Sequence, residues 1–462
     1  TPDIPTMTLA VFLAALIGVP CAVGLPVAFH RTLRGYSFAA RTSLAWATGS
    51  LAVAAILTVE SAFGFRWSPW FIIFITVLTL VAALLTTRTE TPMLPAPRTT
   101  VGYETRVVSV TILLIAAAGL LSFAAGAATS ADLSYFWGVK AVHFALERGI
   151  DFDLLRQPYM IHLHPNYPPL WPVLLGWGSM IAGSMPWLAI SSLTWICLSA
   201  AAAVIFSVLE TRLGMPAAAV VTCFWYGVLM SMATASFSGG NADGFLLLCV
   251  SIALVVILTE PASGPRQLRW VAAIALAGAV FTKSEGGVVA ALIIGGTTTR
   301  DLIWKRPRVV REALTLISLA FVALAIWAAV RVTHDLPLAD PIREKAFVIS
   351  FVNIDLVLRV CGRLLATGPA AVGWFVPLIS LLLMGWRPLS RALPGLATAF
   401  GVPLFAVIYY LHAVGDPLEL IVWTFPRLIQ TAVSAWILGL GVVVFSAGND
   451  ATHGAGIREA IS

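Results

Sequence analysis

The sequence is dominated by a succession of apolar stretches, each about as long as a helix that crosses a lipid bilayer. Such a helix needs roughly 20 apolar residues, with about 17–25 as the usual range. Apolar stretches lie at 7–28, 41–59, 68–86, 107–127, 168–184, 187–208, 216–235, 244–259, 268–282, 286–298, 313–332, 367–385, 394–413 and 428–447. The pattern predicts an all-α integral membrane protein, a polytopic helical bundle of about 13–14 transmembrane segments.

The composition supports this class and argues against a soluble fold. Only 11% of the 462 residues are charged and 59% are hydrophobic, with a mean hydropathy of +0.92. Soluble chains carry roughly 25% charged residues. The net charge of +6 comes from short basic clusters between apolar stretches, so we expect a lipid bilayer and no nucleic acid as partner. The five cysteines show no CxxC spacing, which is typical of small core residues.

The basic clusters predict which side of the membrane each connecting loop occupies. Cytoplasmic loops of membrane proteins carry an excess of Lys and Arg, and such residues cluster here at 30–41, 88–106, 300–311 and 387–391. We expect these clusters to be cytoplasmic, and alternation of the segments then places the loop at 128–167 on the outer face. The predicted location is the inner (cytoplasmic) membrane of the cell, crossed many times.

Simple alternation fails between two stretches that both belong outside, the loop at 128–167 and the turn at 241–243. Three apolar segments lie between them, at 168–184, 187–208 and 216–235, and an odd number of crossings cannot return to the same face. We therefore expect one segment to be interrupted or too short to cross, which is tolerated where backbone is buried or lines a cavity. Helix-breaking residues favour the first two segments: Gly176, Gly178, Gly183 and Pro186.

The chain is expected to divide into three regions. Extra transmembrane helices occupy 1–106, and a module with the candidate site occupies 107–300, including the outer loop at 128–167. The C-terminal transmembrane helices follow at 301–462, with a second outer loop at 334–365. The sequence shows neither a soluble domain nor an internal repeat, so we look for function in the outer loops and the helix ends beside them.

Residues 129–172 form the longest polar interval in the first half of the chain. The interval contains three aspartates, three histidines, two arginines, one lysine and one glutamate. Ionisable groups beside hydrocarbon are costly unless they have partners or a function, so this interval is the first place to look for a site. Asp132 precedes a helical run that ends near Glu147, and aromatic residues such as Trp137 suit a helix in the membrane interface.

Four short motifs follow one another between residues 110 and 300. Asp132 comes after an outward-going apolar segment and before Trp137 and Lys140-Ala141, and then come His164-Pro-Asn-Tyr-Pro-Pro-Leu170, Gly239-Gly-Asn-Ala-Asp243 and Thr282-Lys-Ser-Glu-Gly286. Their order and their shared outer face resemble the GT-C superfamily of membrane glycosyltransferases, which includes protein mannosyltransferases and aminoarabinose transferases. The chain departs from that family at its N-terminus, where three extra spans precede the loop.

The resemblance implies a GT-C type fold with an external catalytic loop of juxtamembrane helices. It also implies that a sugar passes from a polyprenyl-phosphate carrier to an acceptor hydroxyl on the outer face. Such chemistry needs a base for the acceptor proton and cations for the departing phosphate. Asp132 is the candidate general base, from its position and from the resemblance, and a helix N-cap is its alternative role. Asp153 is the second catalytic candidate, although carboxylates are also ordinary in turns.

The same reasoning marks further residues as candidates for substrate binding: Trp137, Lys140, His164, Asn166, Tyr167, Asp243, Lys283, Glu285 and Arg427. Lys283 lies between two apolar segments, where a charge usually faces a cavity. It can contact the carrier phosphate or neutralise Glu285. Arg427 stands near the start of the last span, where it either binds phosphate or anchors the helix at the interface.

The sequence leaves several alternatives open. His162 and His164, with Asp132 or Asp153, are a weak candidate for a divalent-metal site, so no metal or other cofactor is assigned. A transporter or flippase of lipid-linked saccharides is a second function, although transporters usually place their polar groups near the bilayer midplane. A ligase that uses a lipid-diphosphate donor is a third function. The sugar, the stereochemical outcome and the acceptor, whether a glycan, a lipid or a protein, are not determined.

Overall fold

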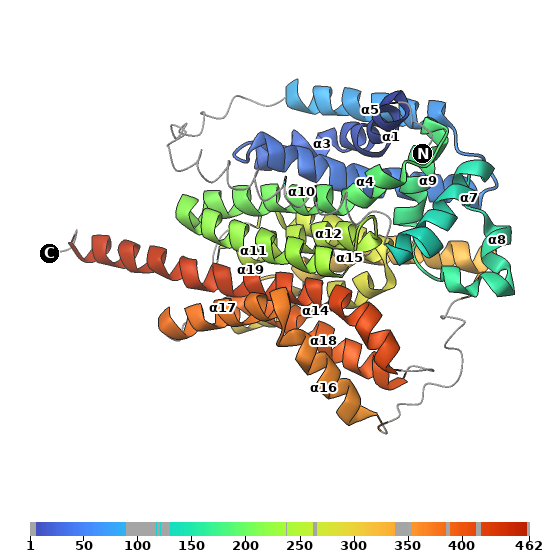
Figure 1. Cartoon of the computed structure of the whole chain (residues 1–462). Coiled ribbons are helices and arrows are strands. Elements are labelled where there is room, and N and C mark those ends of the chain that lie inside the picture. The colour runs from blue at the N-terminus through green and yellow to red at the C-terminus, as the bar shows by residue number, and fades with distance from the viewer. Residues whose placement is uncertain are drawn as a thin grey trace.

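The computed structural model describes residues 6–88, 130–236, 238–261, 266–337, 353–384, 389–412 and 417–459, together with Ala117, Leu121 and Phe351. Every regular element in these ranges is a helix (Figure 1). The elements are α1 (Thr6–Leu13), η1 (Ala14–Gly18), α2 (Val19–Val23), α3 (Leu25–Ala28), η2 (Arg31–Leu33), α4 (Phe38–Ala62), α5 (Pro69–Arg88), η4 (Leu133–Trp137), α7 (Gly138–Glu147), α8 (Phe152–Arg156), η5 (Pro158–Leu163), α9 (Leu170–Ala182), α10 (Trp187–Leu213), α11 (Met215–Ala235), α12 (Ala242–Leu258), α13 (Arg269–Thr282), α14 (Ser284–Ile303), α15 (Val309–Thr333), α16 (Ile354–Leu365), α17 (Gly368–Met384), η7 (Leu389–Ala392), α18 (Leu393–His412) and α19 (Pro417–Glu459). The predicted all-α class is confirmed for these residues, whereas almost all of the segment expected at 107–127 lies outside them.

Among the described residues, six helical stretches are long and apolar enough to cross a membrane: α4, α10, α11, α15, Leu389–His412 and Leu418–Ser446. α16 and α17 make a seventh candidate if the two parts, which are bent by 74°, count as one span. Further apolar helices have 10–17 residues, among them α9, α12 and α13. The described chain is a multi-pass helical membrane protein, with fewer full-length spans than the expected 13–14. Several apolar stretches end early, as α9 does at Gly183 and α13 at Lys283.

α9 has the features expected of the interrupted segment that the distribution of basic residues predicts. It has 13 residues and stops at Gly183, whose φ of +73° lies in the left-handed region that glycine favours. At its start, Trp171 Nε1 donates to the carbonyl of Gly240 (2.8 Å), and after its end the carbonyl of Ile190 lies beside the same glycine. The start of α9 and the first turn of α10 therefore lie at the same end of the bundle. Two crossings, α10 and α11, then lead to the turn at 241–243.

α12 forms the centre of the bundle. All of its residues, from Ala242 to Leu258, are buried, including Asp243 in the first turn. The helix packs against α10, α13 and α19, and α10, α12 and α19 run in roughly the same direction across Figure 1. A helix that is buried on every side has apolar residues on all of its faces, which explains why the residues after Asp243 show no polar face.

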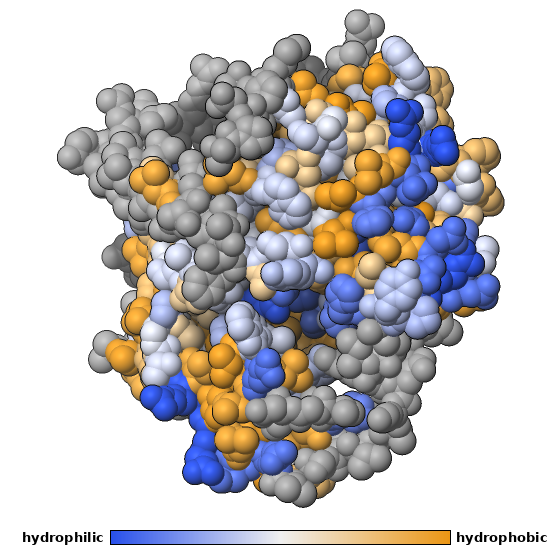
Figure 2. Space-filling model, turned by 45° about the vertical axis from the view of Figure 1, so that its right-hand side comes forward, coloured by the Kyte–Doolittle hydropathy of each residue, from blue (hydrophilic) through white to orange (hydrophobic). Residues whose placement is uncertain are grey.

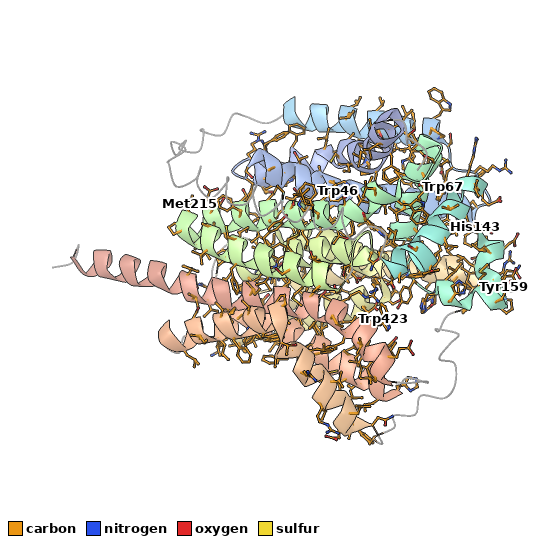
Figure 3. The ribbon with its side chains drawn as sticks, in the orientation of Figure 1. Trp46, Trp67, His143, Tyr159, Met215 and Trp423 are labelled. Carbon is orange, nitrogen blue, oxygen red and sulfur yellow. The ribbon has the colours of Figure 1, made fainter. Side chains whose placement is uncertain are left out.

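The two ends of the bundle carry different structures. Met215, the first residue of α11, lies at one end, whereas His143 and Tyr159 lie at the other end, where α7, α8 and η5 gather (Figure 3). Figure 2 turns this second end toward the viewer and shows hydrophilic side chains beside hydrophobic ones. The second end, formed by residues 133–163 and the helix ends beside them, is called the loop end below.

Candidate functional site

A cavity of about 520 Å³ opens at the loop end. Its lining residues are Ala131, Asp132, Tyr135, Phe136, His162, His164, Asn166, Tyr167, Lys283, Ser284, Glu285, Phe405, Tyr409, Leu420, Trp423, Thr424, Arg427 and Leu428. Three parts of the chain meet there: the polar loop, the junction of α13 and α14, and the adjoining ends of α18 and α19. The cavity therefore brings together most of the residues that the sequence marks as site candidates.

Asp132 faces this cavity and is paired with Arg427. The guanidinium Nη1 of Arg427 donates a hydrogen bond to Oδ2 of Asp132. Asp132 stands at the N-cap position of η4, yet its side chain makes no capping hydrogen bond there. The alternative role of Asp132 as a helix cap is thus not supported. Arg427 is largely buried and turns toward a carboxylate inside the protein, unlike an arginine that reaches out to the interface.

Lys283 lies in the break between α13 and α14, where the backbone is extended (φ −157°). Its Nζ is 2.9 Å from Oδ1 of Asp243 and 3.6 Å from Oε1 of Glu285. Tyr167 donates from its hydroxyl to the same Glu285 oxygen at 3.5 Å. Asp243 lies behind the main cavity, beside a small void that it shares with Glu285 and Arg427. Two of the sequence motifs therefore meet in one buried ion cluster.

The turn at 164–167 forms another wall of the cavity. His164 has a φ of +48°, which is unfavourable for a residue with a Cβ. Its carbonyl accepts hydrogen bonds from Lys140 Nζ (3.2 Å) and from the backbone N–H of Tyr167 (3.0 Å). The carbonyl of Asn166 accepts from Trp327 Nε1 (3.0 Å), on α15. The unusual backbone conformation is thus held by bonds from α7 and α15.

Trp137 and Lys140 lie behind this wall and do not line the cavity. Both side chains are buried, and Lys140 Nζ lies 4.2 Å from the centre of the Phe136 ring and 5.3 Å from the centre of the Trp137 ring. Burial lowers the pKa of Lys140 well below its ordinary value. The structure therefore gives these two residues a supporting position instead of direct access to a substrate in the cavity.

Asp153 is not brought to the cavity that contains Asp132. Its side chain is 86% exposed and pairs with Arg156, the two atoms being 2.5 Å apart. It lines a separate hollow of about 320 Å³ together with Asp151. Asp151 caps α8 by accepting from the backbone N–H of Leu154 (2.8 Å), and it lies 3.4 Å from His143. Asp153 is therefore close to Asp132 in the sequence but does not belong to the same site.

One wall of the cavity is apolar and comes from α18 and α19. Phe405, Tyr409, Leu420 and Trp423 line it, and Trp423 is 61% exposed (Figure 3). None of these residues stands out in the sequence: Phe405 and Tyr409 lie in the apolar stretch at 394–413, which predicts only a span, and Leu420 and Trp423 lie in the short interval before the last span. The available signal was their position: Trp423 and Leu420 precede Arg427 by about one and two helical turns.

His162 and His164 both line the cavity that contains Asp132. Within the part of the chain that the structure describes, however, no three His, Cys, Asp or Glu side chains come together in a way that could hold a metal ion. The two histidines contribute polar side chains to the cavity wall.

Comparison of the chain with protein-family models, with curated proteins and with solved structures yields no significant match, so the cavity itself carries the functional argument.

Proposed function

We propose that the chain is a membrane glycosyltransferase that transfers a sugar from a polyprenyl-phosphate carrier to an acceptor hydroxyl. One observation carries the proposal: a single cavity combines two carboxylates and two cations with an apolar wall. A polyprenyl phosphate has the matching parts, a charged head and an apolar tail. Lys283 and Arg427 suit the phosphate, and Asp132 lies beside them as a base for the acceptor.

The apolar wall continues onto the outer surface of α18 and α19. Leu404 and Ile408 are exposed on α18, and Val422 is exposed on α19 next to Trp423. Exposed apolar side chains on a membrane-spanning helix face lipid, because in water they would be unfavourable. A carrier tail can therefore remain in the bilayer while its head group occupies the cavity, which is what a lipid-linked donor requires.

In the proposed reaction, the acceptor oxygen attacks the anomeric carbon of the sugar. The bond between that carbon and the carrier's phosphate oxygen breaks, and its electron pair leaves with the phosphate. Asp132 takes the proton that the acceptor hydroxyl loses, a contribution of roughly 10²–10⁴-fold to the rate. Arg427 and Lys283 stabilise the negative charge on the departing phosphate. The products are the glycosylated acceptor and the polyprenyl phosphate.

This cavity is proposed to lie on the outer face of the inner membrane. α14 begins at the cavity, directly after Lys283, and ends within the basic stretch at 300–311. Arg300 and Arg306 are buried in ion pairs within that stretch, so they do not contribute to an exposed positive surface. Exposed basic side chains nevertheless remain there: Lys305, Arg308 and Arg311. Such residues are typical of a cytoplasmic loop, which leaves the cavity on the opposite side.

A transfer assay with the purified protein in liposomes tests the proposal. The protein is supplied with an extract of membrane lipids and glycans as the source of acceptor hydroxyls, and with either a short-chain prenyl monophosphate sugar or the matching diphosphate sugar, each radiolabelled in the sugar. We expect the monophosphate donor to be consumed and prenyl phosphate to be released. Consumption of the diphosphate donor alone supports the ligase instead. Movement of the intact labelled lipid between leaflets, without cleavage, supports the flippase, and either result overturns the proposal.

A further inference from the structure

The two cations of the cavity differ in the number of carboxylates with which they form ion pairs. Lys283 has two carboxylate neighbours, Asp243 at 2.9 Å and Glu285 at 3.6 Å. Arg427 is hydrogen-bonded to Asp132, and among the described residues its Nε is buried without a hydrogen-bond partner. Because a guanidinium has five N–H donors, Arg427 keeps donors available for a further anion, whereas Lys283 lies between two carboxylates.

Asp132 is the most accessible of the three carboxylates. Its side chain is 34% exposed, compared with 8% for Asp243 and 20% for Glu285. Its carboxylate makes no capping bond to the helix that it precedes. Asp132 is thus held in place by Arg427 and not by its own backbone, so it can leave the guanidinium when another anion takes that place.

We infer that the donor's phosphate and the Asp132 carboxylate compete for Arg427, so that Asp132 is released as a base only when the donor binds. The inference rests on the proposed function and adds an order of events to it. Guanidinium binds phosphate through two parallel hydrogen bonds, which is a stronger arrangement than a single bond to a carboxylate oxygen. The phosphate of the donor is therefore expected to replace the Asp132 carboxylate as the partner of Arg427.

The exchange has a direct chemical consequence. While it accepts a hydrogen bond from Arg427, Oδ2 of Asp132 is directed at the guanidinium and is less available to the proton of an acceptor hydroxyl. Once the phosphate occupies Arg427, Oδ2 of Asp132 is free to face the acceptor, and the proton passes to it as the new bond to the sugar forms. In the absence of donor, the ion pair with Arg427 keeps Oδ2 of Asp132 engaged.

Binding of farnesyl phosphate, a short prenyl phosphate, tests the competition. Affinities are measured by calorimetry in detergent for the wild-type protein, for Asp132→Asn and for Asp355→Asn. Asp355 is the matched control because it also pairs with an arginine, Arg359, but on the exposed surface of α16. The Asp132→Asn protein lacks the competing charge and is expected to bind farnesyl phosphate on the order of tenfold more tightly than the wild type, because charge-assisted hydrogen bonds are involved. The Asp355→Asn protein is expected to bind as the wild type does.

Two further measurements make each outcome decisive. Asp132→Ser is measured as a second variant in case Asp132→Asn does not fold, and farnesol, which lacks the phosphate, reports binding of the tail alone. Equal or weaker binding of farnesyl phosphate by both Asp132 variants, with clear binding by the wild type, overturns the exchange but leaves the proposed donor class intact. Failure of the wild type to bind farnesyl phosphate better than farnesol overturns both.

Discussion

The guanidinium of Arg427 on α19 donates a hydrogen bond to the carboxylate of Asp132 at the start of η4, across 295 positions of the sequence. This contact joins the polar loop to the last helix and places a charge of each sign on the lining of one cavity. Two features that the sequence shows far apart, an acidic loop and a lone arginine at a span, are thus one unit of the site.

Replacing Arg427 by alanine is expected to weaken the binding of farnesyl phosphate by on the order of tenfold to a hundredfold. A hydrogen bond to a charged group contributes about 1.5–3 kcal/mol. Calorimetry in detergent measures the change, and Arg359→Ala, which removes an exposed arginine on α16, serves as the control. If the Arg427→Ala protein binds as tightly as this control, Arg427 does not hold the phosphate.

The two ends of α14 are expected to face opposite sides of the membrane. Single cysteines at Ser134 and Lys305, both exposed positions, should react with a membrane-impermeant maleimide from opposite sides of sealed vesicles. Ser134 should label from outside and Lys305 from the cytoplasmic side, in a background without the native cysteines. Labelling of both positions from the same side contradicts the proposed orientation.

A buried ion network joins the ends of α12, α13 and α14 that are remote from the cavity. Arg269 donates to Glu260 (2.9 Å) and to Asp301 (3.0 Å), and all three side chains are buried. Arg269→Ala leaves two carboxylates without this partner and is expected to destabilise the fold by about 3–5 kcal/mol. Arg359→Ala, at an exposed pair, is expected to cost about 0–1 kcal/mol. Thermal unfolding in detergent compares the two, and equal melting temperatures contradict the prediction.

The stability of the fold should depend on pH through Lys140. Burial lowers the pKa of this group in the folded chain, whereas the unfolded chain has the ordinary lysine value of 10.5. Below that value the unfolded chain binds more protons, so stability should rise with pH toward 10.5 and fall as pH decreases toward the lowered pKa. Melting temperatures measured between about pH 8 and 10 should rise in the wild type and stay flatter in Lys140→Met. Identical slopes in the two proteins would show that Lys140 does not titrate differently on folding.

Local signals in the sequence predicted the class of fold and much of the cavity lining. The length of apolar stretches indicates membrane spans without reference to any contact. The motifs at 164–170 and 282–286 place polar residues at the ends of apolar segments, and alternation brings such ends to one face. The glycines near 176–183 likewise predicted the interrupted helix, because the stopping residue, Gly183, adopts a conformation that other residues avoid.

The pairing of charges was not predictable, because it depends on which helices become neighbours. The nearest carboxylate to Lys283 is Asp243, 40 positions away, and not Glu285, two positions away. Asp153 lies near Asp132 in sequence, yet its short helix α8 turns it toward solvent and Arg156. Trp137 and Lys140 belong to the first motif, but the packing of α7 buries them behind the cavity wall. These differences arise from tertiary packing, which a pattern of residues does not report.

Turnover by Asp132→Asn is the decisive measurement for the role of Asp132 as the base. Asparagine keeps the shape of the side chain and can still cap a helix, but it cannot accept the proton of an acceptor hydroxyl. With a prenyl monophosphate sugar as donor, and Asp355→Asn as control, we expect a folded Asp132→Asn protein that binds farnesyl phosphate and turns over at least about a hundredfold more slowly. A folded Asp132→Asn protein that turns over within a few-fold of the control would contradict the proposed mechanism.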